Sequence, residues 1–103
     1  MNERPIPDAA LHDPDAVEML RVWIAGQELH CAMKIGMYQE GGAIPEDGAW
    51  GTILAGVARH LAHALETGYG LDAAETLEGI RRRFNAELDK VPPPVTGGFV
   101  RRH

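Results

Sequence analysis

The sequence has little cysteine, few aromatic residues and no long apolar run. Its single cysteine cannot close a disulfide within the chain, and a small domain without disulfides is typical of a reducing compartment. No apolar stretch approaches the ~18 residues that a membrane-spanning helix needs. The first eight residues, MNERPIPD, also lack the apolar segment of a secretory signal. We therefore expect a soluble, cytoplasmic protein with no membrane partner.

Basic residues are fewer than acidic ones. Ten Lys and Arg stand against fifteen Asp and Glu, which gives a net charge of −5 and an isoelectric point near 5.4. Generic nucleic-acid binding needs a basic surface that releases counterions from phosphates. The glycines form neither a G-x-G-x-x-G nor a G-x-x-x-x-G-K motif, so no phosphate-binding loop is indicated. The sequence therefore disfavours nucleic acid as a partner.

The remaining composition is that of one small globular domain. Apolar residues make up 45% and charged residues 24% of the 103 residues, close to the average for folded chains. Prolines and aspartates fill residues 1–16, which we expect to be an irregular arm. Residues 17–90 form the domain, and residues 91–103 form a Pro/Gly-rich tail.

Residues 17–37 predict a β-hairpin whose register follows from its turn. Gly26 and Gln27 separate two strand-like runs, 17–25 and 28–37, and a glycine in the first central position favours a type II′ turn. A two-residue loop pairs Ala25 with Glu28. Strand alternation then places six apolar side chains on one face, which we expect to be buried: Leu20, Val22, Ile24, Leu29, Cys31 and Met33.

Two helices are predicted after the hairpin. The first begins near Pro45 and ends at Gly68 and Gly70, with an apolar stripe of Trp50, Ile53, Leu54, Val57, Leu61 and Leu65. Its polar side chains share an arc of only ~120°, and one remaining flank carries the small residues Gly51, Ala55, Ala58 and Ala62. The second helix begins after an Asp72 cap with Glu75 three residues on, and ends near Asp89.

We expect an α+β fold in the order ββαα. The antiparallel hairpin is backed on one face by the two helices, which are antiparallel to each other. A two-stranded sheet alone is marginal in water, so dimerisation or a terminal strand could extend it. So few ordered residues also bury little apolar surface, and small domains often gain the missing stability by oligomerisation.

The opposite hairpin face holds the candidate binding residues, which mix an aromatic ring, two cations, an imidazole and a thioether: Met19, Arg21, Trp23, His30 and Lys34. Two interpretations stay open, a solvated sheet face and a binding surface, because Trp, Arg and Met are enriched where a partner removes water. His60 and His63 lie on adjacent turns and could share a metal, but the sequence signals no third ligand. Cys31 alternates onto the apolar face, so we predict no catalytic residues, no metal and no cofactor.

Four short motifs follow one another in an unusual order: LRVWI at 20–24, Trp50-Gly51, ARH at 58–60 and FNAEL at 84–88. In this order they resemble a small bacterial family, the domain of unknown function numbered 5076, over residues 5–90. The resemblance implies an α+β domain of about this length in bacteria and no established activity.

Two hypotheses about function follow. The first is a homodimeric interaction or structural module without catalytic activity, whose shared sheet or helix surface is its main purpose. The second is a small anionic-ligand binder, or a minor enzyme, that uses the face of Arg21, Trp23, His30 and Lys34. They differ in whether a second copy fills the Trp23 face or leaves it open.

Overall fold

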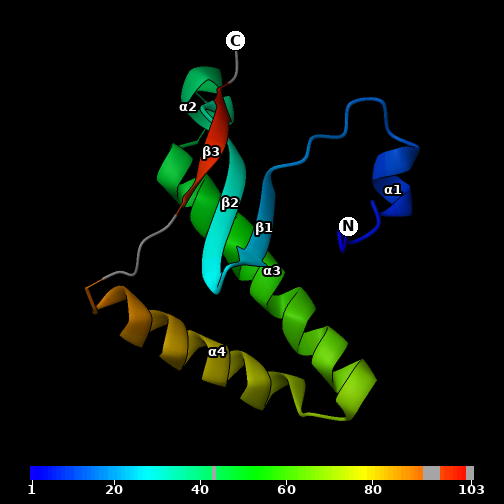
Figure 1. Ribbon diagram of the computed structural model, residues 1–103, viewed down its shortest axis with the longest axis vertical. Helices are drawn as coiled ribbons and strands as arrows, with labels where there is room; N and C mark the ends of the chain where they lie inside the picture. Colours follow the sequence, from blue (N-terminus) through cyan, green and yellow to red (C-terminus); the bar gives the residue numbers. More distant parts are fainter. Residues whose placement is uncertain (43, 92–95, 102–103) are drawn as a thin grey trace. The chain divides into compact units, whose positions relative to one another are not determined.

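The computed structural model describes residues 1–42, 44–91 and 96–101, and its contacts divide the chain into two units. One unit comprises Met1–Ile35 with Val95–His103, and the other comprises Gly36–Pro94. The α+β class is confirmed, but the ββαα order is incomplete. The observed elements are α1 (Asp8–Leu11), β1 (Leu20–Ala25), β2 (Glu28–Ile35), α2 (Met37–Gly41), α3 (Glu46–Tyr69), α4 (Ala73–Leu88) and β3 (Thr96–Arg101) (Figure 1).

The hairpin has the predicted register. β1 and β2 are antiparallel and pair from Leu20 opposite Met33 to Ala25 opposite Glu28. The Lys34 amide also donates a hydrogen bond of 3.0 Å to the Met19 carbonyl, which continues the ladder by one pair. The two-residue loop thus agrees with the observed pairing. The expected burial of the apolar hairpin face is wrong for three of its residues, because Val22, Ile24 and Leu29 are exposed.

The turn type, in contrast, was predicted wrongly. Gly26 has φ 58° and Gln27 has φ 63°, so both central residues are left-handed, as in a type I′ turn. A type II′ turn has positive φ only in its first central position. Type I′ matches the right-handed twist of the strands, and this preference outweighs the strain on Gln27.

A third strand extends the sheet. β3 pairs in parallel with β2, with His30 opposite Thr96 and Ile35 opposite Arg101, so β2 is central. β3 lies inside the stretch predicted as a tail, residues 91–103. Of that stretch, residues 92–95 and 102–103 lie outside the described residues. The predicted extension by a terminal strand is therefore confirmed.

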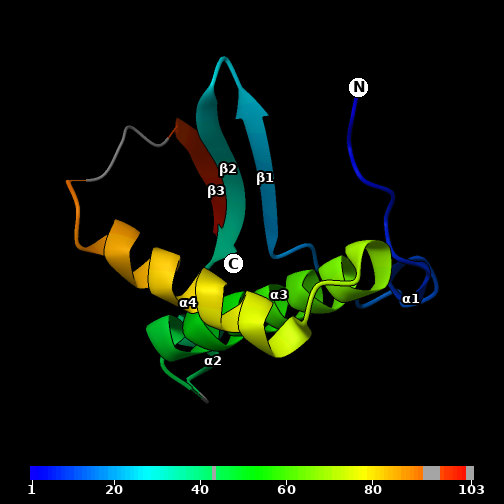
Figure 2. The ribbon, with the colours of Figure 1, turned by 90° about the horizontal axis from the view of Figure 1, so that it is seen from below.

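The helical unit contains α2, α3 and α4, and α3 and α4 diverge from the short turn that joins them (Figures 1 and 2). α3 begins at Glu46, close to the predicted start, and Pro45 occupies its N-cap position in an extended conformation, with ψ 140°. Gly70 ends α3 with φ 70°, and its amide donates to the Glu66 carbonyl. The predicted cap of α4 is confirmed, because the Glu75 amide donates to Asp72 Oδ2 at 2.8 Å.

Burial in the described residues is sparse. Ala49 and Ala62 are the two buried apolar residues among them, and both belong to α3. Trp50, Ile53 and Leu65 of the predicted buried stripe are half-buried. The rest of the stripe is exposed: Leu54, Val57 and Leu61. Among the described residues, no helix is both long and apolar enough to span a membrane.

Candidate functional site

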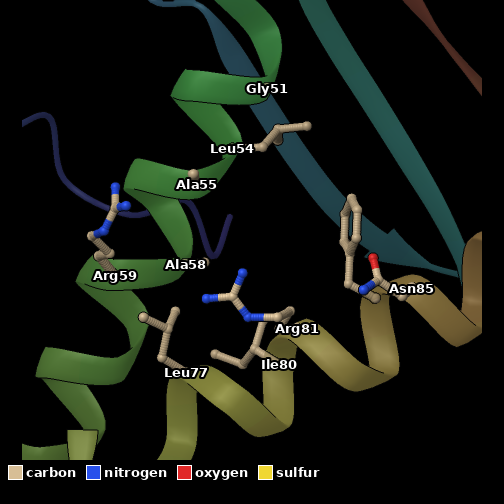
Figure 3. Close-up of a pocket in the computed structure, with 10 residues that line it drawn as sticks. Gly51, Leu54, Ala55, Ala58, Arg59, Leu77, Ile80, Arg81 and Asn85 are labelled. Atoms are coloured by element: carbon tan, nitrogen blue, oxygen red, sulfur yellow. The ribbon is translucent and has the colours of Figure 1, made fainter. Parts of the chain in front are cut away.

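A groove of about 300 Å³ lies between α3 and α4, within the helical unit (Figure 3). From α3 it is lined by Gly51, Leu54, Ala55, Ala58 and Arg59. From α4 it is lined by Leu77, Ile80, Arg81, Phe84 and Asn85. Its volume is at the lower end of the range for small-molecule sites, and most of its lining is apolar.

Small residues on α3 create the space for this groove. Gly51, Ala55 and Ala58 recur at spacings of four and three, so they share one face of the helix. They belong to the small-residue flank that the sequence predicted to allow close approach by another backbone. In the structure this flank faces the side chains of α4 across the groove.

The other wall is the apolar stripe of α4. Leu77, Ile80 and Phe84 follow the spacing of three and four that places side chains on one helix face. Leu77 and Ile80 are half-buried, whereas Phe84 is 50% exposed. Exposure thus increases along α4 away from the turn, as expected where two helices diverge.

Hydrogen bonds at the turn hold the two walls together. A Glu66 carboxylate oxygen on α3 accepts the Ala73 amide of α4 at 3.3 Å. The Asp72 cap accepts the Glu75 amide three residues further on. Two of the four amides at the start of α4 that have no acceptor within the helix are therefore hydrogen-bonded, one to Glu66 and one to Asp72.

The polar part of the groove is positively charged. Arg59 and Arg81 line it, one from each helix, and no acidic residue lines it. In the described part of the chain Arg59 has no ion-pair partner, whereas Arg81 Nε lies 3.2 Å from Glu78 Oε2 in an exposed pair. Asn85 adds an amide from α4. The groove thus combines an apolar lining with two arginines and no acidic residue, in a chain of net charge −5.

A second polar cluster surrounds Glu46. Its carboxylate accepts the backbone amides of Gly36, Tyr38 and Gln39 at 3.1, 3.0 and 2.9 Å. It also accepts the indole N–H of Trp50 at 2.9 Å. Desolvation raises the pKa of this carboxyl, but the four hydrogen bonds outweigh it and hold the pKa below its ordinary value. All the acceptor capacity of this group is directed at α2 and α3, so we assign it a structural role.

The structure places the predicted hairpin residues as follows. Trp23 lies directly opposite His30, and both are half-buried. His30 Nε2 also lies 3.2 Å from the Ala25 carbonyl oxygen. Arg21 is opposite Ala32 and forms a 2.9 Å ion pair with Glu18, whose hydrogen bond and charge raise the pKa of Arg21. Met19 and Lys34 form the next pair through the backbone bond described above.

The alternative metal ligands remain two side chains on one helix. His60 and His63 are both exposed on α3. Within residues 1–42, 44–91 and 96–101, no three His, Cys, Asp or Glu side chains are grouped as metal ligands would be. Cys31 is half-buried and unpaired by any disulfide.

Sequence reasoning missed the groove and the role of Glu46. The sequence alone shows the apolar residues of α4 and the small-residue flank of α3. It does not show that the two helices diverge. From the sequence alone, Arg59 is one of the polar side chains on the ~120° arc of α3, and Glu46 is an acid of its first turn that complements the helix dipole. The acceptor geometry of Glu46 depends on α2, for which the sequence provided no signal.

A family model matches residues 3–91, which includes α1, both hairpin strands and all of the helical unit up to the end of α4. The model is that of the domain of unknown function DUF5076. The chain belongs to this family. The resemblance inferred from the short motifs is therefore confirmed.

The match to DUF5076 ends before β3, so the third strand lies outside it. A search of curated proteins found no match to this DUF5076 chain. Among solved structures, it is similar to a protein from the photosynthetic bacterium Rhodopseudomonas palustrus CGA009 that is provisionally described as a pyruvate dehydrogenase. The identity is 28% and the TM-score 0.67, over 93% of this chain and 91% of the other.

Proposed function

We propose that this DUF5076 domain is a homodimeric interaction module of the bacterial cytoplasm, without catalytic activity. The observation that carries the proposal is the sparse burial of the helical unit, where Ala49 and Ala62 are the buried apolar residues described. Fully burying one Leu or Val side chain stabilises a protein by roughly 1.5–3 kcal/mol. Because only two alanines of the described chain are buried, the larger apolar side chains of this unit contribute little of the stabilisation that their burial in an interface would provide. The free Cys31 supports a reducing compartment.

The surface best suited to self-association is a ridge on α3. Val57 is 45% and Leu61 51% exposed, and they lie four residues apart on successive turns. Ala64, which is also exposed, continues the same line of side chains. We call Val57, Leu61 and Ala64 the α3 ridge. The small-residue wall of the groove, Gly51, Ala55 and Ala58, points roughly 100° away from this ridge around the helix, whereas Leu54, seven residues before Leu61, borders both surfaces.

A second copy is the occupant that we propose for the α3 ridge. Twofold dimers are the commonest soluble homo-oligomers, and in them one self-complementary patch meets itself. The ridge carries no charge, and Ala64 at its end would let the two helices approach closely. The packing of the hairpin's apolar face on the helices belongs to the same proposal. It is supported by the exposure of Val22 and Ile24.

Sedimentation over a range of concentrations tests the proposal. We expect a dimer at micromolar concentration, and we expect Leu61→Glu to shift it to monomer while its helical circular dichroism is retained. His63→Glu is the matched control, because it adds the same charge on the exposed polar side of α3. A wild-type monomer at the highest concentration, or equal association of both variants, would contradict the proposal.

Binding of a small anion by the hairpin face is the second candidate. It is supported by the Trp23–His30 pair and by the half-buried Lys34, while the Glu18 ion pair of Arg21 weakens it. The similar structure is described by the name of an enzyme that acts on pyruvate, a small carboxylate. Titration with pyruvate, with Lys34→Gln as the variant, tests this candidate. Equal heats for wild type and variant would remove it.

A further inference from the structure

The α3–α4 groove has a feature that dimerisation through the α3 ridge does not use. Its lining is apolar except for two arginines, one from each wall, and an asparagine; in Figure 3 the guanidinium group of Arg81 is directed across the groove, whereas that of Arg59 lies on the side of α3 away from α4. An apolar groove that only receives a second helix needs no such charges. Both arginines are exposed, so each is accessible to an anion that enters from solvent.

The two arginines are available to a ligand. Arg59 has no ion-pair partner within the described residues, and Arg81 contacts Glu78 through Nε alone in an exposed pair. Such pairs contribute little to stability, so an incoming anion can replace one readily. Figure 3 shows the Arg81 side chain reaching from α4 toward α3. Guanidinium groups bind carboxylates through two parallel hydrogen bonds, and Asn85 adds a further donor on the same wall.

The apolar lining favours a ligand whose uncharged part is also apolar. Leu54 lies on α3, and Leu77, Ile80 and Phe84 lie on α4, so an aliphatic or aromatic body would contact both helices. About 300 Å³ accommodates a molecule of ordinary metabolite size, not a folded domain. We infer that the α3–α4 groove binds a small amphipathic carboxylate, with the apolar body between the helices and the carboxylate at Arg81.

This site does not require the proposed dimer, because none of the α3 ridge residues, Val57, Leu61 and Ala64, lines the groove. Failure of one proposal therefore leaves the other standing. The Leu61→Glu variant separates the two directly. A groove site should bind the same probe with the same affinity in that variant as in the wild type.

Octanoate is the probe, with 1-octanol and octylamine as analogues of the same chain length. Calorimetry should show that octanoate binds the full chain more tightly than either analogue does. Arg81→Gln should weaken octanoate by about tenfold, the value of one charge-assisted hydrogen bond, and leave octanol unchanged. Phe84→Ser should weaken octanoate and octanol alike.

Arg83→Gln is the matched control, because Arg83 lies on the same helix, pairs with Glu87 at 3.7 Å and does not line the groove. It removes the same charge from the chain and should leave octanoate binding unchanged. Amide resonances that shift on titration should belong to α3 and α4. Equal affinity for octanoate and octanol, equal loss in Arg83→Gln and Arg81→Gln, or shifts confined to the hairpin would each overturn the inference.

Discussion

The carboxylate of Glu46 accepts the indole N–H of Trp50 at 2.9 Å, one turn further along α3. The same group accepts three backbone amides at the start of α2, those of Gly36, Tyr38 and Gln39. The capping residue of α2 is Gly36, which has no side chain to offer and a φ of 92°. A residue of α3 thus performs the capping of α2, and the first turn of α3 is tied to the preceding segment.

Glu46→Gln should destabilise the fold. Glutamine keeps one acceptor oxygen but replaces the other by an NH₂ group, which would face amide donors. We expect a lower urea midpoint in equilibrium unfolding monitored by Trp50 fluorescence. Glu40→Gln removes an exposed acid of α2 that receives none of these bonds, so it should change the midpoint little. Equal midpoints for the two variants would show that the Glu46 cluster contributes nothing.

The same cluster predicts a pH dependence. The hydrogen bonds favour the ionised form of Glu46, so its pKa in the folded state lies below the ordinary value of 4.5. The stabilisation is therefore fully present above pH 4.5 and is lost as the pH falls through the folded-state pKa. Unfolding midpoints measured from neutral to acid pH should converge for wild type and Glu46→Gln. A difference that grows toward acid pH would contradict this assignment.

Asp72→Ala should cost about 1 kcal/mol of unfolding free energy, the usual value for loss of a helix N-cap. The reason is that the Glu75 amide would lose its acceptor at 2.8 Å. Asp72→Ser retains a capping oxygen and should recover most of the loss. Urea unfolding of the three proteins measures the difference. A serine variant as unstable as the alanine variant would mean that the charge, and not the cap, is what stabilises α4.

The parts of the fold that local rules govern could be predicted from the sequence. The register from Leu20–Met33 to Ala25–Glu28 follows from a two-residue loop and a period of two. The Asp72 cap and the Gly70 terminus follow from residue types that satisfy helix ends. None of these depends on how distant elements meet.

The features that depend on tertiary contacts were not predictable in the same way. A stripe containing Leu54 and Leu61 identifies an apolar helix face, but not whether another element covers it. The divergence of α3 and α4 decides that, and it opens the groove. Likewise the sequence places Arg59 on the polar arc of α3, but it does not place the wall that contains Arg81 beside it.

Gln27→Gly should stabilise the hairpin. Gln27 has φ 63°, in the left-handed region where a Cβ atom costs roughly 1–2 kcal/mol and glycine has no such penalty. Part of this gain is offset by the greater backbone freedom of glycine when unfolded, so we expect a net gain of about 1 kcal/mol. Gln27→Ala retains the Cβ and should change stability little. A gain from alanine equal to that from glycine would rule out backbone strain as the cause.

Val22→Cys should form a disulfide with Cys31 on mild oxidation. Lys34 and Met19 form a hydrogen-bonded pair, and the pairs of an antiparallel ladder alternate, so Val22 and Cys31 form a non-hydrogen-bonded pair. Such pairs have Cα atoms about 4.5 Å apart, which is within the range that a disulfide spans.

Arg21→Cys is the control for this disulfide, because residue 21 is opposite Ala32 and points to the other face of the sheet. Mass spectrometry should detect the loss of two hydrogens within one chain for Val22→Cys and not for Arg21→Cys. The bridged chain should also resist urea better than its reduced form, since the crosslink restricts the unfolded state. A bridge in Arg21→Cys instead would require a register shifted by one residue, which would move the whole apolar face of the hairpin to the opposite side.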